Sequence, residues 1–407
     1  MDRRPGLGAG WAGERCTIRA MAAGVPLIDV IHKLLESSDL TFHDFMEMAL
    51  YHPEHGYYAR AENPVGKEGD YVTSPSLSPL FSDTLSLLVT EFASRGGDEV
   101  STVVDIGCGD GSLIHSLYDA VGARAISPAT EMAGEIARPP RFYGVDRSLS
   151  RVKRGDGVQF AGSLAEVPRE GQHLLIANEL FDALPVHRLV QRGEHLHELW
   201  VTERNGELDW SEHEAPAAFE DYFAARDIEL ADGQFVDVSL EWESQFEEMC
   251  GFLRRGVIVV FDYGYPEKRL FDPRVRRFGT SASYRQQRVS RDLLVDPGLQ
   301  DLTAHINFTD LIRAGERKGL RTVFFDRQAK FLLALGGAEH DLLRPIDQGM
   351  DQRKIASLEG GLAFLQQRED AKRLLLPDGI GEDIRVLVQI KDLDDSGWSF
   401  QRPLFNR

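Results

Sequence analysis

The stretch that most constrains the fold is an apolar run that ends in an acid and three alternating glycines, Val103-Val104-Asp105-Ile106-Gly107-Cys108-Gly109-Asp110-Gly111. A β-branched run before such glycines predicts a buried strand that breaks into a tight turn and opens a helix. Glycines at alternate positions let a bound molecule approach the main chain closely. We therefore expect a ligand at this turn. The alternative is a glycine-rich turn that binds nothing.

The glycine spacing and the acid narrow the chemistry of that ligand. The spacing is Gly-x-Gly-x-Gly, which differs from the Gly-x-Gly-x-x-Gly that seats a pyrophosphate at a helix N-terminus. Asp105 near the turn would repel a phosphate, whereas it suits a ligand with an ammonium and a sulfonium. S-adenosylmethionine carries both groups, so we predict it as the cofactor, with Asp105, Gly107, Gly109 and Gly111 at its site.

A second acid follows the next expected strand, Arg141-Phe-Tyr-Gly-Val-Asp146. In a doubly wound fold an acid at this place accepts hydrogen bonds from a ribose diol, because a carboxylate offers only acceptors to two hydroxyl donors. The alternative is that Asp146 caps a helix, since Arg147-Ser148 follows it. A third expected strand, 158–160, leads to Ser163 and Leu164, which we place near the adenine ring.

Further candidate residues follow the expected strand 174–177, in the segment Asn178-Glu-Leu-Phe-Asp-Ala-Leu-Pro185. We assign Asn178 to the cofactor, and Glu179 and Asp182 to catalysis. Two carboxylates three residues apart can converge on one point and bind a guanidinium, whose charge they offset beside a sulfonium. The alternative is that Glu179 and Asp182 only cap a helix, where acids are favoured.

Composition excludes several classes of protein. The formal net charge of −19 and the pI near 5.1 argue against binding nucleic acid or an anionic membrane surface. A cationic substrate or a protein partner fits better, although a solvated acidic surface explains the charge equally. No apolar run is long enough to span a membrane, and the three cysteines do not form a pair that predicts a disulfide or a metal site.

The order of expected strands and helices predicts an α/β fold with a doubly wound, mostly parallel sheet. We expect residues 1–24 to be a disordered N-terminal extension and 25–395 to form a single catalytic domain. Within it we expect a helical cap over 25–95, an insertion over 265–300, and helical and strand elements over 340–395. A helix over about 309–320 is expected to be capped by Thr309, and residues 396–407 are expected to form a tail.

Three motifs taken together resemble one known family. They are Leu50-Tyr51-x-Pro53-x-x-Gly56-Tyr57-Tyr58, Gly69-Asp-Tyr-Val-Thr-Ser-Pro75 and Asn178-Glu-Leu-Phe-Asp-Ala-Leu-Pro-Val186. The chain resembles the MidA-like S-adenosylmethionine-dependent methyltransferases from about residue 40 to 340. The resemblance implies a class I, Rossmann-like methyltransferase fold. By analogy with the mitochondrial arginine methyltransferase of this family, it also implies symmetric dimethylation of a protein arginine.

The resemblance also implies roles and partners. Thr73 and Ser74 would close over the cofactor. The expected partners are a protein substrate, by analogy a subunit of a respiratory complex, and a second copy in a homodimer. Nucleic acid, a resident metal and membrane insertion are not expected, and the expected location is the cytoplasm. Four residues depart from the family pattern: Ser76, Ser82, Cys108 and Asn307.

Two other functions stay open at this point. One is an assembly chaperone that binds S-adenosylmethionine without turnover. The other is a small-molecule methyltransferase, with the insertion over 265–300 as the lid of its pocket. Binding of the cofactor alone does not separate these from a protein methyltransferase, because all three bind it.

Overall fold

The computed structural model describes residues 26–60, 66, 69–126, 138–344, 358–377 and 379–402. The expectation of disorder over 1–24 lies outside these residues. The chain divides into two compact units. Unit 1 comprises Met1–Glu62, Pro185–Val238 and Arg276–Thr303, and unit 2 comprises Asn63–Leu184, Ser239–Val275 and Ala304–Arg407. The range 25–395, expected as one catalytic domain, is therefore distributed over both units.

Unit 2 is built on one large sheet. Its strands are β2 (Ser101–Ile106), β3 (Arg141–Val145), β4 (Val158–Ala161), β5 (Gln172–Asn178), β10 (Gly256–Tyr265), β14 (Ile306–Asn307), β15 (Arg321–Arg327) and β16 (Ile384–Lys391). Their hydrogen-bonded order is β15–β16–β10–β5–β2–β3–β4, and β14 pairs with the end of β10. β16 is antiparallel to both neighbours, whereas β10, β5, β2, β3 and β4 run parallel. The predicted doubly wound, mostly parallel sheet is confirmed.

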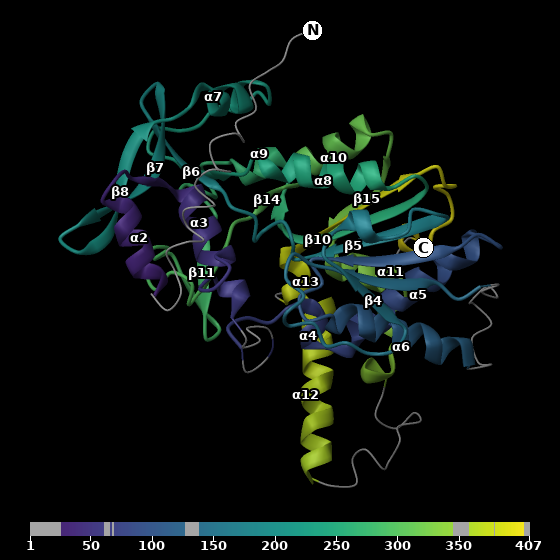
Figure 1. Ribbon diagram of the computed structural model, residues 1–407. Helices are drawn as coiled ribbons and strands as arrows, with labels where there is room; N and C mark the ends of the chain where they lie inside the picture. Colours follow the sequence, from purple (N-terminus) through teal and green to yellow (C-terminus); the bar gives the residue numbers. More distant parts are fainter. Residues whose placement is uncertain are drawn as a thin grey trace. The chain divides into compact units, whose positions relative to one another are not determined.

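Helices cover both faces of this sheet (Figure 1). α8 (Glu241–Phe252) and α10 (Phe308–Arg317) lie on one face, and α5 (Pro79–Arg95), α6 (Ser112–Ile126) and α11 (Gln328–Ala334) lie on the other. The remaining helices of unit 2 are α4 (Ser74–Leu77), α9 (Glu267–Leu270), α12 (Leu358–Leu375) and α13 (Ile380–Asp383). Its 3-10 turns are η2 (Leu164–Glu166), η3 (Gly337–Glu339), η4 (Asp341–Leu343) and η5 (Ser399–Gln401).

The main apolar core lies between the sheet and α5, α6, α11 and α12. Phe261 on β10 is fully buried and packs edge-on against Phe81 of α5 and Phe331 of α11, with ring centroids 5.2 and 5.6 Å apart. Trp398 and Phe400 are buried in the same core. Residues 396–402, expected to begin a tail, are therefore held against unit 2, because their aromatic side chains leave water.

Unit 1 contains two smaller sheets. The first has the order β1 (Leu40–Thr41), β7 (His195–Arg204), β6 (His187–Arg192) and β9 (Phe235–Val238), with β8 (Glu207–Glu214) paired to β7. The second has the order β12 (Arg288–Ser290), β11 (Ala282–Arg285) and β13 (Asp301–Thr303). Its helices are α2 (Leu27–Leu35), α3 (Phe42–Tyr51), η1 (Tyr57–Ala59) and α7 (Ala217–Ala224). Part of the expected insertion over 265–300, which shows no clear period in sequence, thus forms a β-hairpin.

Short polar side chains cap three helices, α3, α5 and α10, at their N-termini. Thr41 accepts a hydrogen bond from the Asp44 amide at 3.0 Å, and Ser78 accepts one from the Leu80 amide at 3.3 Å. The expectation that Thr309 caps α10 is wrong: the N-cap is Asn307, whose Oδ1 accepts from the Thr309 amide at 3.1 Å. Asn is a strong N-cap residue, and here it lies two positions earlier in the chain.

Candidate active site

The glycine turn lies at the carboxyl end of β2, the edge at which the parallel strands of unit 2 all end. Gly107, Gly109 and Gly111 have φ of +74°, +57° and +82°, a region that other residues rarely occupy. The amides of Gly107 and Cys108 both donate to the Val145 carbonyl, at 2.8 and 3.1 Å. These bonds tie the turn to the end of β3 and hold it open toward the strand edge.

The space around the turn fits a ligand at its middle glycine. A Cβ added to Gly107 would lie 2.7 Å from Leu180 Cδ1, and one added to Gly111 would lie 2.9 Å from the Phe160 ring. At Gly109 no described heavy atom lies within 4 Å of that position. The first and third glycines therefore allow close packing, and the second leaves the main chain accessible.

Asp146 lies beside this turn, directly after β3. Its Oδ2 accepts a hydrogen bond from the Gly109 amide at 2.9 Å, and its Oδ1 accepts one from the Ser148 amide at 2.9 Å. No helix begins at this point of the described chain, so Asp146 is not a helix cap. Its half-buried carboxylate joins the end of β3 to the glycine turn.

Asp105 is buried within β2, just before the turn. Burial, and then the negative charges of Asp146 and Asp110, raise the pKa of its carboxyl to about 7. An isolated buried carboxylate is costly, and a cation that reached it would restore its ordinary acidity. This acid is therefore suited to meeting a positively charged group.

We expect the buried Asp105 to make the protein less stable as the pH rises. The pKa of Asp105 is about 7 in the folded protein and 3.8 in the unfolded chain, so the folded state holds the proton more tightly. The stability that this difference provides is fully present below pH 4 and is lost as the pH rises from 4 through 7. Between pH 5 and pH 8 the unfolding free energy of the unliganded wild type should fall by about 3 kcal/mol more than that of Asp105→Asn. Urea unfolding at pH 5, 6, 7 and 8 measures this. Asp119→Asn, on the exposed side of α6, is the matched control, and equal slopes for all three proteins would refute the expectation.

The next part of the site lies at the end of β5. Glu179 has a φ of +52°, an unusual conformation for a residue with a side chain. Its amide donates to the Phe261 carbonyl at 2.8 Å, and its Oε1 accepts from Asn178 Nδ2 at 3.2 Å. Asn178 Oδ1 is buried without a hydrogen-bond partner among the described residues. A buried acceptor without a partner is costly, so this atom is available to a ligand donor.

Thr73 and Ser74 reach this strand end from a distant part of the chain. The Ser74 amide donates to Glu179 Oε1 at 3.3 Å, and Thr73 caps α4 by accepting from the Ser76 amide at 3.4 Å. The Ser74 hydroxyl bonds Gln328, with Oγ 2.9 Å from Nε2 and 3.1 Å from Oε1. Ser74 is fully buried, and its backbone amide positions the Glu179 carboxylate.

Two buried acids lie next to Glu179. Asp262, on β10, accepts from the Phe181 amide and from the Tyr263 amide, both at 2.8 Å. Burial raises the pKa of Asp262 well above its ordinary value, and the negative charges of Asp182 and Glu179 add to the rise. Burial raises the pKa of Asp182 to about 7. The three carboxyls therefore form an acidic cluster, Glu179, Asp182 and Asp262, in which negative charge is already unfavourable.

Glu179 and Asp182 of this cluster are predicted from the sequence, whereas Asp262 and Gln328 are not. Asp262 lies on β10 directly after five apolar residues, 257–261, which is a usable signal, yet it is absent from the predicted site residues. No sequence pattern around Gln328 predicts its role, since its partner Ser74 is 254 positions away. Asp182, predicted to bind the acceptor together with Glu179, is only 6% exposed, and its role stays a prediction.

Ser163 and Leu164 follow β4 at the same strand edge. Ser163 is exposed and its Oγ donates to Glu166 Oε1 at 3.2 Å, while Leu164 is buried at the start of η2. The Asp146 amide donates to the Ala161 carbonyl at 3.2 Å, which links this turn to the end of β3. Their assignment to the adenine ring stays a prediction.

The departures from the family pattern have local structural roles. The Ser76 hydroxyl accepts from the Thr73 amide at 2.9 Å and so completes a capping box. Asn307 Nδ2 donates to Asp310 Oδ2 at 3.0 Å beside its own cap bond. Cys108 is buried under the turn, and burial raises the pKa of its thiol. These residues support the backbone around the site.

Two features together define a class I methyltransferase fold. The first is a parallel sheet in which one strand, β16, is reversed beside the edge strand β15. The second is a glycine turn after one strand with an acid at the end of the next. A family model described as "Putative S-adenosyl-L-methionine-dependent methyltransferase" matches residues 86–325. The chain belongs to this MidA-like family. The predicted cofactor, S-adenosylmethionine, is confirmed as that of the family.

Curated relatives are similar over most of the chain. The mitochondrial protein arginine methyltransferase NDUFAF7 of Mus musculus is 25% identical, over 80% of this chain and 81% of its own. The Homo sapiens protein of that name is 24% identical over 71% and 68%, and the Danio rerio protein 23% over 74% of each. A crystal structure from Burkholderia thailandensis bound to S-adenosyl-homocysteine is 23% identical, covers 97% of this chain and 96% of its own, and has a TM-score of 0.76. This likeness confirms the predicted fold class.

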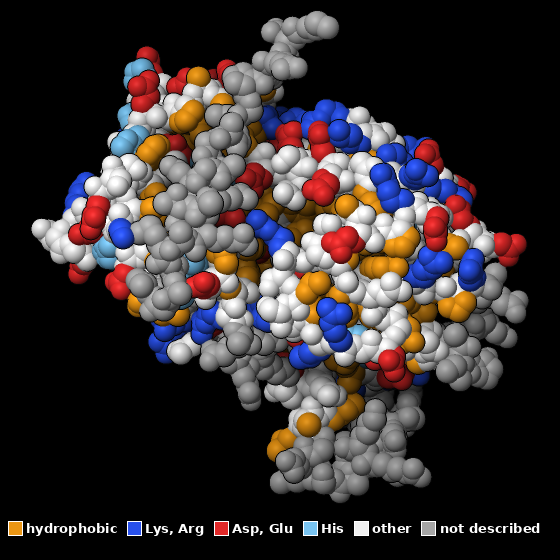
Figure 2. Space-filling model, in the orientation of Figure 1, with side chains coloured by type: hydrophobic (Ala, Val, Ile, Leu, Met, Phe, Trp, Pro, Cys, Tyr) orange, Lys and Arg blue, Asp and Glu red, His pale blue; other side chains and the backbone are white. Residues whose placement is uncertain are grey.

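The predicted cytoplasmic location is contradicted by the three curated relatives, which are all named mitochondrial proteins. The free Cys108 and Cys250 of the described chain fit a reducing environment, which the cytoplasm and the mitochondrial matrix share, and an acidic net charge does not distinguish the two compartments. No helix in the described ranges has the length and hydropathy that a membrane span needs. Figure 2 shows acidic and basic side chains mixed over the visible face. The homodimer stays a prediction.

Proposed function

We propose that the chain is a protein methyltransferase whose acceptor is the guanidinium of an arginine. The observation that carries this proposal is the acidic cluster of Glu179, Asp182 and Asp262, at the strand edge that also holds the glycine turn. The names of the relatives support the acceptor, since NDUFAF7 is a protein arginine methyltransferase in each.

A guanidinium acceptor poses an electrostatic problem that this cluster answers. The acceptor is cationic at neutral pH and has to approach a cationic sulfonium. Carboxylates that accept its hydrogen bonds offset its charge and fix the plane of the fork. In return the guanidinium stabilises the charged form of acids whose pKa values burial has raised. An uncharged acceptor would gain much less from three clustered acids.

In the proposed reaction Glu179 holds the acceptor, because it is the half-buried member of the cluster. S-adenosylmethionine, when bound, supplies a methyl group on a positively charged sulfur. Transfer of that methyl group to nitrogen would leave the electron pair of the broken S–C bond on sulfur, and the Glu179 carboxylate would take the proton that the nitrogen loses. Asp262 positions this acid through the Phe181 amide, and the Ser74 amide holds its Oε1.

The glycine turn and Asp146 would hold the cofactor in this proposal. The Asp146 carboxylate would accept hydrogen bonds from the ribose diol, and the backbone at Gly109 would lie against the cofactor. Asp105 would face its ammonium, and Asn178 Oδ1 would accept a hydrogen bond from it. Support for these roles comes from the open space at Gly109 and the unpaired acceptor of Asn178.

Transfer of a labelled methyl group tests the acceptor. The full chain is incubated with trideuteromethyl S-adenosylmethionine and with protein extract from cells that lack its gene. Mass spectrometry then reads labelled arginine in tryptic peptides, with heat-inactivated protein as the control. We expect label on arginine in a small set of peptides. Label confined to metabolites below 1 kDa would indicate a small-molecule methyltransferase, and cofactor binding without any label would indicate a chaperone. Either result contradicts the proposal.

A further inference from the structure

A basic segment of unit 1 lies outside the site described above. Residues 276–291 contain five arginines, Arg276, Arg277, Arg285, Arg288 and Arg291, and no acid. The chain as a whole carries a formal net charge of −19. A local reversal of sign on this scale creates a positive potential that attracts anions to one place.

The β11–β12 hairpin directs part of this charge to one face. Arg285 is the direct antiparallel partner of Arg288, and Ser283 is the partner of Ser290. Cross-strand partners lie on the same side of a sheet, so these four side chains share a face. Like charges placed directly opposite destabilise a hairpin, and here an ion pair between Arg285 and Asp296 offsets only one of the two charges. An anion between the two guanidinium groups would remove that destabilisation.

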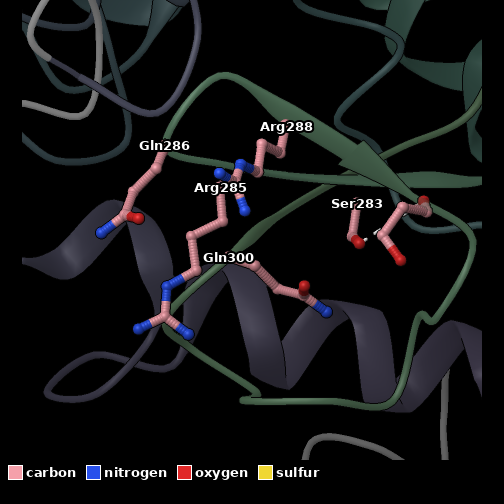
Figure 3. A pocket seen from close by; sticks show the side chains of 6 residues that line it. Ser283, Arg285, Gln286, Arg288 and Gln300 are labelled. Atoms are coloured by element: carbon pink, nitrogen blue, oxygen red, sulfur yellow. Dashed lines mark hydrogen bonds between the residues drawn. The ribbon is translucent and has the colours of Figure 1, made fainter.

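The same face lines a pocket of about 300 Å³. Its lining side chains are all polar: Ser283, Arg285, Gln286, Arg288, Ser290 and Gln300. Figure 3 shows Arg285, Arg288, Gln300 and Ser283 on the same side of the hairpin. The lining contains guanidinium, amide and hydroxyl groups and no carboxylate, and such groups bind a carboxylate or another oxyanion.

The two arginines of the pocket differ in their existing partners. Arg285 forms an ion pair with Asp296. No hydrogen bond or ion pair joins the Arg288 guanidinium to any residue that the structure describes. Arg288 is therefore the charge that remains to be neutralised, and Asp296 competes with an incoming anion for Arg285.

The surroundings of the pocket favour a protein segment as the source of that anion. Val295 and Leu299, chain neighbours of Asp296 and Gln300, are 47% and 44% exposed. Exposed apolar side chains beside a basic pocket are typical of surfaces that bind a peptide with acidic and apolar residues. β12 is also an edge strand of its sheet, to which an extended chain can add. A nucleic acid would require a broader basic surface than one hairpin in an acidic chain.

We infer that the basic pocket at this hairpin, lined by Arg285, Arg288 and Gln300, docks an acidic segment of the methyl-acceptor protein. The inference rests on the proposed function for the identity of the partner. It extends that proposal to a binding surface on unit 1, whereas the acidic cluster belongs to unit 2. Recognition of the substrate would then use opposite charges at two places, a cation at the acidic cluster and anions at the hairpin.

Peptide binding tests this inference without requiring catalysis. The probe is a fluorescein-labelled peptide of alternating glutamate and leucine, and fluorescence anisotropy measures its affinity for the full chain at 50 and 200 mM salt. We expect weaker binding at the higher salt and no binding of the matching glutamine–leucine peptide. Arg288→Glu should weaken binding of the acidic peptide at least about tenfold. Arg254→Glu, an exposed arginine of unit 2, is the charge-matched control and should leave it unchanged.

A second variant makes the test independent of damage to the fold. Asp296→Asn removes the competitor for Arg285, and asparagine tolerates the φ of +47° found there. We expect this variant to bind the acidic peptide about fivefold more tightly, the effect of releasing one exposed ion pair. Calorimetry with S-adenosylmethionine should show unchanged cofactor binding in both variants.

Three results would overturn the inference. They are equal affinity for the acidic and glutamine peptides, no effect of Arg288→Glu, and binding of anionic vesicles or single-stranded RNA in place of the peptide. If the peptide binds as expected while no arginine becomes methylated, the docking surface stands and the proposed function fails. If arginine is methylated and Arg288→Glu leaves peptide binding unchanged, the proposed function stands and the docking surface fails.

Discussion

Glu179→Gln is expected to lower the rate of methyl transfer at least about 100-fold, which is the range for loss of a charge that acts on the reacting group. Glutamine keeps the length of the side chain and an oxygen for the Ser74 amide, which now lies 3.3 Å from Glu179 Oε1. It cannot offset the charge of a guanidinium or accept its proton. The measurement is the initial rate of label incorporation into arginine from trideuteromethyl S-adenosylmethionine.

Three controls separate this effect from a general loss of structure. The melting temperature of Glu179→Gln should equal or exceed that of the wild type, because the change removes one charge from the acidic cluster. S-adenosyl-homocysteine should bind within about threefold of the wild type, since the proposed role of Glu179 concerns the acceptor. Asp119→Asn, an exposed acid on α6, should keep the full rate. If Glu179→Gln retained more than half of the rate, the role of Glu179 would be wrong.

Asp146→Ala is expected to weaken S-adenosyl-homocysteine binding at least about tenfold, the loss expected for one charged hydrogen bond to a diol. The carboxylate also accepts from the Gly109 amide at 2.9 Å, so its removal loosens the turn as well. Isothermal titration calorimetry on the full chain measures both the affinity and the enthalpy.

Two further variants divide these effects. Asp146→Glu keeps two acceptor oxygens for a diol and should bind within about tenfold of the wild type. Asp146→Asn keeps one acceptor for the Gly109 amide and loses the charge, so its affinity should lie between those of the wild type and Asp146→Ala. Wild-type affinity in Asp146→Ala would remove Asp146 from the cofactor site.

Local patterns in the sequence predicted most of unit 2. The apolar runs at 103–106 and 174–177 each become a strand that ends at the predicted edge. These strands can be predicted because a strand that is buried on both faces is continuously apolar. The ends of the strands can be predicted because a nucleotide-binding fold of this kind has glycines and acids at fixed places after its strands. The three glycines with positive φ are the most direct example.

Contacts between distant segments could not be predicted in this way. Unit 1 assembles from three separate stretches, and its β11–β12 hairpin lies in a range with no clear period. Burial of Asp182 depends on what packs around it and is not encoded by its residue type. Gln328 and Asp262 support the candidate site through bonds to Ser74 and Phe181, residues 254 and 81 positions away. The spacing of residues along the chain does not predict hydrogen bonds between segments that are so far apart.

The central claim is that the glycine turn and the acidic cluster together transfer a methyl group to arginine in a protein. The most direct measurement compares methylated arginines by quantitative mass spectrometry in three cell lines, with the gene intact, deleted, and replaced by Glu179→Gln. We expect specific methylarginine peptides that are present only with the intact gene. Identical methylarginine profiles in all three lines would contradict it.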